Sequence, residues 1–200
     1  MNIIPKDSRY IPFTQQMWCC APTCIQMVMY RRGIPLVSAE LIGHYLGLTV
    51  PKKDLRHFWH GRTGKKSSAG WGTKINQKKY APNNAFKKLH IPLRLEFKLI
   101  DQFGNFVDFK NYLQEIEKKD KDTLACYEVK ILDGGKIHGG HVCVIDKVYL
   151  KQGKIRLIDP SRLSPKWKIV SIKKLYEAMK FHGVKNASGF WELIPTKIQR

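Results

Sequence analysis

The fold is decided by the stretch Gln15–Tyr30, which reads QQMWCCAPTCIQMVMY. Its second half repeats apolar residues at three- and four-residue spacing, which is the period of a helix with one buried face. The apolar positions are Cys24, Ile25, Val28 and Met29. Two arginines and Gly33 follow, a common way for a helix to end. The stretch therefore predicts a helix over residues 21–30 that begins directly after two cysteines.

Cys20 stands at the predicted start of this helix. The helix dipole and a nearby imidazolium both favour a thiolate at such a position, and the thiolate is the nucleophilic form of cysteine. The base for such a nucleophile comes from elsewhere in the chain and needs a third group to hold its ring. Cys20 is therefore the candidate nucleophile, with Cys19 as the alternative.

Two predicted strands in the second half of the chain offer the partners. Residues 141–150 and 154–158 are rich in Val, Ile and Tyr, and residues 151–153 read as a turn between them. In an antiparallel hairpin the start of one strand lies beside the end of the other. We therefore predict that His141 is the base and that Asp159 orients it. His138, in the glycine-rich turn before His141, is the alternative base.

Three short blocks together resemble papain-like cysteine peptidases. They are residues 15–28, the sequence GHVCVI at 140–145 and the sequence LIDP at 157–160. The branch that they resemble most is that of the bacteriocin-leader-processing peptidases and related bacterial effector proteases. The resemblance extends from about Pro12 to Leu193 in the order of the elements.

The resemblance implies an α+β, papain-like fold. An N-terminal helical half that carries Cys20 packs on a twisted antiparallel sheet that carries His141 and Asp159, with the site in the cleft between them. Gln15 or Gln16, with Gln15 preferred, matches the glutamine whose amide stabilises the oxyanion beside the backbone N–H of Cys20.

Two positions depart from the family pattern. Ala21 follows the candidate nucleophile, where the family usually has Gly or Trp, and Cys19 stands directly before it. Three further residues are expected to contact the substrate, and these are Trp18, Trp71 and Gly140.

The predicted reaction is hydrolysis of a peptide bond by a Cys-His-Asp triad through an acyl-enzyme, without a metal or cofactor. The substrate is a protein or peptide. The same triad could instead deamidate glutamine or transfer the acyl group to an amine. The non-catalytic alternative is a basic protein that binds nucleic acid or zinc, the latter through Cys20, Cys24, His141 and Cys143.

Composition indicates the number of domains, the charge of a partner and the state of the cysteines. The chain has 200 residues, enough for one domain with a sizeable core, and its 36 Lys and Arg against 16 Asp and Glu give a net charge of +20. Such an excess implies an acidic partner, which could be a protein, nucleic acid or an anionic membrane face. The five cysteines read as free thiols, with Cys24, Cys126 and Cys143 packed in the core.

No stretch has the length and apolar character of a membrane span or signal peptide. We therefore expect a soluble protein, located in the cytoplasm or delivered to a host or neighbouring cell without a signal peptide.

The rest of the chain predicts alternating elements around one irregular segment. Helices are expected from Ser38 to Gly47 and at 83–89, 106–118 and 171–181, and strands at 93–99, 123–131 and 189–194. In the helix at 106–118 the expected apolar positions are Val107, Tyr112, Leu113 and Ile116. Residues 51–82, rich in Lys and Gly and containing Phe58, Trp59 and Trp71, show no period. We expect a loop insertion there that borders the cleft and selects acidic or extended substrates.

Overall fold

The computed structural model describes residues 5–57, 59–60, 65–134, 136 and 138–196. A six-stranded antiparallel sheet lies at the centre, with strand order β5-β10-β6-β7-β8-β9. The strands are β5 (Leu93–Leu99), β6 (Asp122–Glu128), β7 (Gly140–Tyr149), β8 (Lys154–Ile158), β9 (Trp167–Ser171) and β10 (Gly189–Pro195). The expected α+β class and antiparallel sheet are confirmed.

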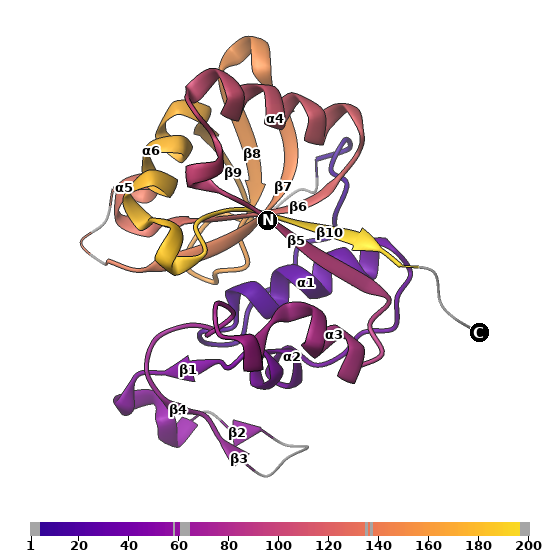
Figure 1. The fold of residues 1–200 in the computed structure, drawn as a ribbon, viewed down its shortest axis with the longest axis vertical. Coiled ribbons are helices and arrows are strands. Elements are labelled where there is room, and N and C mark those ends of the chain that lie inside the picture. Colours follow the sequence, from indigo (N-terminus) through magenta and orange to yellow (C-terminus); the bar gives the residue numbers. More distant parts are fainter. Residues whose placement is uncertain (1–4, 58, 61–64, 135, 137, 197–200) are drawn as a thin grey trace.

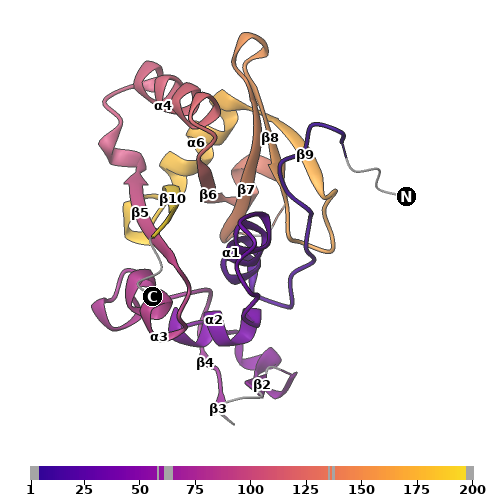
Figure 2. The ribbon, with the colours of Figure 1, turned by 90° about the vertical axis from the view of Figure 1, so that its right-hand side faces the viewer.

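Helices cover both faces of this sheet (Figure 1, Figure 2). On one face lie α1 (Cys20–Arg31), α2 (Ala39–Tyr45) and α3 (Pro82–Lys88). On the other lie α4 (Phe106–Lys118), α5 (Val129–Asp133) and α6 (Ile172–His182). The N-terminal helical half expected from the sequence therefore accounts for one of two helical layers.

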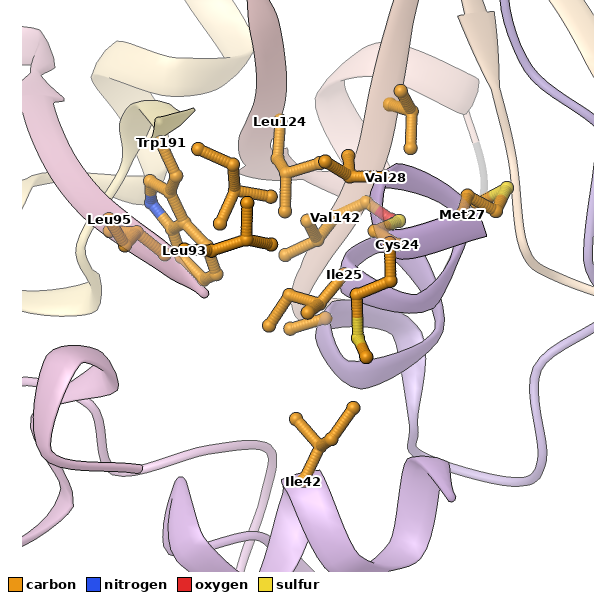
Figure 3. Close-up of a cluster of buried hydrophobic side chains, with 14 of the residues drawn as sticks. Cys24, Ile25, Met27, Val28, Ile42, Leu93, Leu95, Leu124, Val142 and Trp191 are labelled. Carbon is orange, nitrogen blue, oxygen red and sulfur yellow. The ribbon is translucent and has the colours of Figure 1, made fainter. Parts of the chain in front are cut away.

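The strands bury alternate residues on the two faces, as the two-residue period of a strand requires. Val142 and Val144 of β7 pack toward α1, in the cluster that Figure 3 shows with Cys24 and Ile25. Cys143 and Ile145 of the same strand pack in the cluster of α4 and α6. The sheet is therefore the shared wall of two apolar clusters.

Residues 46–92, which we call the basic lobe, contain mostly short elements. These are β1 (Thr49–Val50), η1 (Lys52–His57), β2 (Trp59–His60), β3 (Lys65–Lys66), β4 (Ser68–Ala69) and η2 (Lys78–Tyr80), ahead of α3. Val50 and Ile75 are buried, so the lobe is anchored to the protein and is not only a surface loop. Phe58, Gly61, Gly64 and the side chain of Trp59 lie outside the described residues.

Most local predictions are confirmed. The bounds of α4, β5 and β8 agree with the expected ranges, and Ser38 caps α2 by accepting a hydrogen bond from the backbone N–H of Leu41. The prediction for Val107 is wrong, because this residue is 62% exposed. Phe109 is buried in its place, with Leu113 and Ile116, at spacings that follow one face of the helix.

The strand expected at 123–131 is also wrong in its last part. Strand β6 ends at Glu128, and residues 129–133 form α5. Leu132 is buried there, and Gly134 ends the helix in the left-handed conformation with φ 76°. A glycine in this conformation is a common helix stop, and it overrides the local strand propensity of the valine and isoleucine.

The β7–β8 hairpin contains a one-residue irregularity at Asp146. The pairing shifts between Ile145 and Lys147. Asp146 is fully buried, and its carboxylate accepts hydrogen bonds from Arg156 Nε at 2.6 Å and from the backbone N–H of Arg9 at 2.8 Å. These bonds tie the N-terminal segment to the sheet and satisfy the buried charge.

Candidate active site

Cys20 is the first residue of α1 and is half-buried. Burial raises the pKa of its thiol. A hydrogen bond from His141, the positive charge of His141 and the backbone N–H groups of Val142 and Ala21 have a larger effect in the opposite direction. The pKa of Cys20 therefore lies below its ordinary value. Hydrogen bonds to the charged form stabilise a thiolate in this way. The surroundings of Cys20 therefore favour the thiolate, which is the nucleophilic form of cysteine.

The start of helix α1 lies near His141, beside the end of β7 that has no β8 residue opposite it. Strand β8 ends at Ile158, opposite Val144, so Val142 has no β8 residue beside it. Instead its carbonyl accepts a hydrogen bond from Cys24 Sγ at 3.3 Å, and its N–H stabilises the Cys20 thiolate. The start of α1 is therefore docked against the open edge of β7, next to His141.

The other four thiols differ from Cys20. Cys19, Cys24, Cys126 and Cys143 are all buried and unbridged, which confirms the expected packing of the last three. Burial raises the pKa of each of them. Cys19 is fully buried, so it is a poor candidate for attack on a substrate. These observations favour Cys20 over Cys19.

His141 and Asp159 are in contact, as the hairpin predicted. His141 Nε2 lies 2.7 Å from Asp159 Oδ1, which leaves Nδ1 as the ring nitrogen available to Cys20. Burial lowers the pKa of His141, but its contacts with Cys143, Asp159 and Cys20 hold this pKa well above its ordinary value. These contacts therefore favour the imidazolium form of His141, and a buried carboxylate fixes the orientation of its ring.

His138 points to other groups. Its Nε2 lies 2.8 Å from Lys130 Nζ and its Nδ1 lies 3.5 Å from Glu128 Oε1, and its ring stacks on Phe181. The side chain is 56% exposed. The alternative base named from the sequence therefore has no contact with Asp159.

A buried lysine holds the second oxygen of Asp159. Lys168 Nζ lies 2.8 Å from Asp159 Oδ2 and 2.9 Å from Asp133 Oδ1, above the ring of Tyr127. Burial raises the pKa of Asp159, but His141 and Lys168 lower it further, so that it lies below its ordinary value. Asp159 is therefore ionised and held by both of its oxygens.

Sequence reasoning missed Lys168 because it missed strand β9. Along this strand the polar residue points inward and the apolar neighbour outward: Lys168 is 11% exposed while Ile169 is 58% exposed. The two-residue alternation from Trp167 to Ser171 is a signal for a strand. It predicts, however, that Trp167 and Ile169 face the core, whereas Lys168 is the residue that does so.

Three side chains beside Lys168 carry atoms of the kind that bind metal ions. These atoms, from His141, Cys143 and Asp159, lie within 4.8 Å of one another. A zinc ion there would compete with the ammonium of Lys168, which already binds Asp159. Cys24 donates to a carbonyl and so retains its proton. The geometry therefore fits an ion-paired triad better than a zinc site.

Gln15 lies beside the triad and Gln16 does not. The backbone N–H of Gln15 donates to the carbonyl of Pro160 at 2.7 Å, and its buried Oε1 has no hydrogen-bond partner among the described residues. Gln16 is exposed. Gln15 is therefore the better candidate for a side chain that meets a substrate.

Trp18 and Trp71 are brought together next to the nucleophile. Their rings meet edge to face with centroids 5.0 Å apart, and Trp18 Nε1 donates to Asp54 Oδ2 at 3.1 Å. Trp18 has a positive φ of 67°, a conformation that is strained for a bulky residue. Trp71 is 67% exposed. Asp54, which holds Trp18 in this pair, is a residue that sequence reasoning missed.

Gly140 is exposed and has little room for a side chain. A Cβ there would lie 2.5 Å from His182 Nε2. His182 Nδ1 in turn lies 3.2 Å from Glu128 Oε2, and Glu128 Oε1 accepts the N–H of Gly139 at 2.7 Å. Glu128 and His182, two further residues that sequence reasoning missed, therefore hold the turn that leads into His141.

A surface hollow lined by residues 148–152 lies at the turn end of β7 and β8. It is at the opposite end of these strands from His141 and Asp159, so it is not the expected cleft. Across the described part of the chain, no helix has both the length and the apolar character needed to cross a bilayer.

Two comparisons of the sequence with known proteins find no match. No family model matches the chain, and no curated protein matches it in sequence.

Proposed function

We propose that this protein is a papain-like cysteine peptidase that hydrolyses peptide bonds. One observation carries the proposal: the half-buried Cys20 is in hydrogen-bond contact with His141, whose Nε2 lies 2.7 Å from Oδ1 of the buried Asp159. A nucleophile, a base and a group that orients the base are the parts that acyl transfer needs.

The reaction follows from these positions. The Cys20 thiolate attacks the carbonyl carbon of the scissile bond, and the carbonyl oxygen becomes an oxyanion. The backbone N–H of Cys20, which has no acceptor within its helix, and the side-chain amide of Gln15 stabilise this charge. His141 gives its proton to the leaving amine, and an acyl-enzyme remains.

The second half of the reaction releases the acid. His141, now neutral, removes a proton from water, and the resulting hydroxide attacks the thioester carbon. The C–S bond breaks, the Cys20 thiolate is restored, and the proton stays on His141. Asp159 keeps the ring in one orientation and stabilises the imidazolium in both halves.

The test is covalent labelling with a peptide that carries an electrophilic ketone. We expect one adduct per protein on Cys20, none in the Cys20→Ser variant, and unchanged labelling in the matched Cys24→Ser variant. Mass mapping that finds the adduct on Cys19 or Cys126 would overturn the proposal.

A peptide library then identifies the reaction class. Cleaved fragments support a peptidase. Intact peptides that have lost an amide at glutamine, or gained an amine, identify the same triad as a deamidase or an acyltransferase.

A further inference from the structure

The basic lobe concentrates the charge of the protein. Residues 46–92 contain eleven Lys and Arg and a single acidic residue, Asp54, which gives +10 in 47 residues. The remaining 153 residues contain 25 Lys and Arg against 15 Asp and Glu, which also gives +10. Half of the net charge therefore lies in less than a quarter of the chain.

The exposed lysines among the described residues of this lobe have no carboxylate partner there. These six are Lys52, Lys53, Lys78, Lys79, Lys87 and Lys88. No ion pair between described residues involves any of these six, whereas Lys121, Lys147 and Lys168 outside the lobe each lie within 3.1 Å of a carboxylate. The single acidic residue of the lobe, Asp54, is engaged by Trp18. The positive surface of the lobe is therefore not neutralised within the described fold.

The lobe is joined to the residues that precede the nucleophile. Cys19 packs in one apolar cluster with Leu48 and Val50, and Trp18 contacts both Asp54 and Trp71. Figure 1 places β1 and β4 on the α1 side of the sheet, the side opposite to α4, and Figure 2 shows β4 on the same side. A chain bound along the lobe would therefore be held next to the start of α1.

The aromatic residues of the lobe favour a polypeptide over a nucleic acid. Single-stranded nucleic acids need a series of open aromatic faces on which bases stack. Among the described residues of the lobe, Trp71 is the one large aromatic side chain that is exposed, and Trp18 already contacts it edge to face. Lys79 Nζ covers the ring of Tyr80. The described part of the lobe therefore offers charge without a stacking platform.

We propose that the basic lobe captures acidic polypeptide substrates and delivers them to Cys20. This inference rests on the proposed peptidase function. Complementary charge of this kind acts mainly on the encounter rate and on partner selection, and it weakens as salt screens it.

The experiment measures peptide binding without turnover. In the Cys20→Ala background, a fluorescent glutamate-rich peptide and its glutamine-substituted match are titrated at low and high salt. A lobe variant, Lys78→Glu with Lys79→Glu, is compared with Lys173→Glu plus Lys174→Glu, which makes the same change of charge at two exposed residues of α6.

We expect the acidic peptide to bind about tenfold more tightly than its neutral match at low salt, and the lobe variant to remove most of this preference. The α6 variant should retain it. Equal binding of the two peptides, or equal loss in the two variants, would overturn the inference. Preferential binding of a single-stranded oligonucleotide to the lobe would identify a nucleic-acid surface instead.

Failure of the inference is separable from failure of the proposed function. Iodoacetamide is uncharged, so the lobe charge variant with Cys20 present should be alkylated at Cys20 as fast as the unchanged protein. If Cys20 reacts with neither iodoacetamide nor the peptide ketone, the peptidase proposal fails, while the binding comparison still reports on the lobe.

Discussion

The charged side chains at the sheet end around His141 differ from those of the basic lobe in whether they have partners of opposite charge. Around His141, ion pairs of 2.7 to 2.9 Å join His141 to Asp159 and Lys168 to Asp159 and Asp133. A hydrogen bond of 3.2 Å joins His182 Nδ1 and Glu128 Oε2. In the lobe, the exposed lysines have no carboxylate partner among the described residues. Charge at the sheet end is neutralised within the fold and fixes geometry, whereas charge in the lobe is left for a partner. The two regions should therefore respond differently to substitution.

The largest effect is expected from His141→Ala. Without the imidazolium the pKa of Cys20 returns toward that of a free thiol, so alkylation of Cys20 near pH 6.5 should slow by about 10²-fold. The rate of iodoacetamide labelling measures this. The matched variant His138→Ala should keep the original rate, and an equal loss in both variants would contradict the assignment of His141.

Lys168→Met should cause the next largest change. The substitution leaves one carboxylate oxygen of the buried Asp159 without a charged partner. Breaking a buried pair in this way costs about 3 kcal/mol of unfolding free energy. Urea denaturation measures the loss. The matched control is Lys147→Met, which breaks a half-exposed pair with Glu117 and should cost less than about 1 kcal/mol. Equal losses would mean that the ion pairs at the sheet end are no more important than surface pairs.

Trp71→Ala tests the connection between the two regions. It removes an edge-to-face aromatic pair, and such pairs contribute about 0.5–1.5 kcal/mol. Because Trp71 is largely exposed, we expect a small loss of stability, unchanged alkylation of Cys20 and weaker binding of the acidic peptide. A slowed alkylation would instead show that Trp71 supports the start of α1.

The smallest change is expected in the pH dependence of Cys20 alkylation. The pKa of Cys20 is lowered from 9.0 and that of His141 is raised from 6.5, and the thiolate and the imidazolium coexist between the lowered pKa of Cys20 and the raised pKa of His141. As the pH falls through 9.0 the rate should therefore stay nearly constant, and it should decrease only at the lower pH at which Cys20 gains a proton. A tenfold decrease per pH unit below pH 9 is the behaviour of an unpaired thiol and would exclude the ion pair.

Local sequence patterns predicted the elements that carry the triad. The helix at α1, the hairpin of β7 and β8 and the contact of His141 with Asp159 all follow from periodicity and turn residues. Lys168 could not be found in this way, because its burial depends on carboxylates that come from Asp159 and Asp133, in other elements. The structure of the basic lobe depends on Trp18, Val50 and Ile75 contacting distant residues, and such contacts leave no local period.

The irregularity at Asp146 decides whether odd-numbered or even-numbered residues of β8 lie on the same face of the sheet as His141. Near the turn, Lys147 pairs with Arg156, and that register, if continued, would place Asp159 opposite Val144, on the α1 face. The extra residue moves the register by one, so that Ile158 is opposite Val144 and Asp159 falls on the other face. His141 is an odd-numbered neighbour of Cys143 and shares that face. One inserted residue, some five positions from His141, therefore sets the parity that allows the histidine and the aspartate to meet.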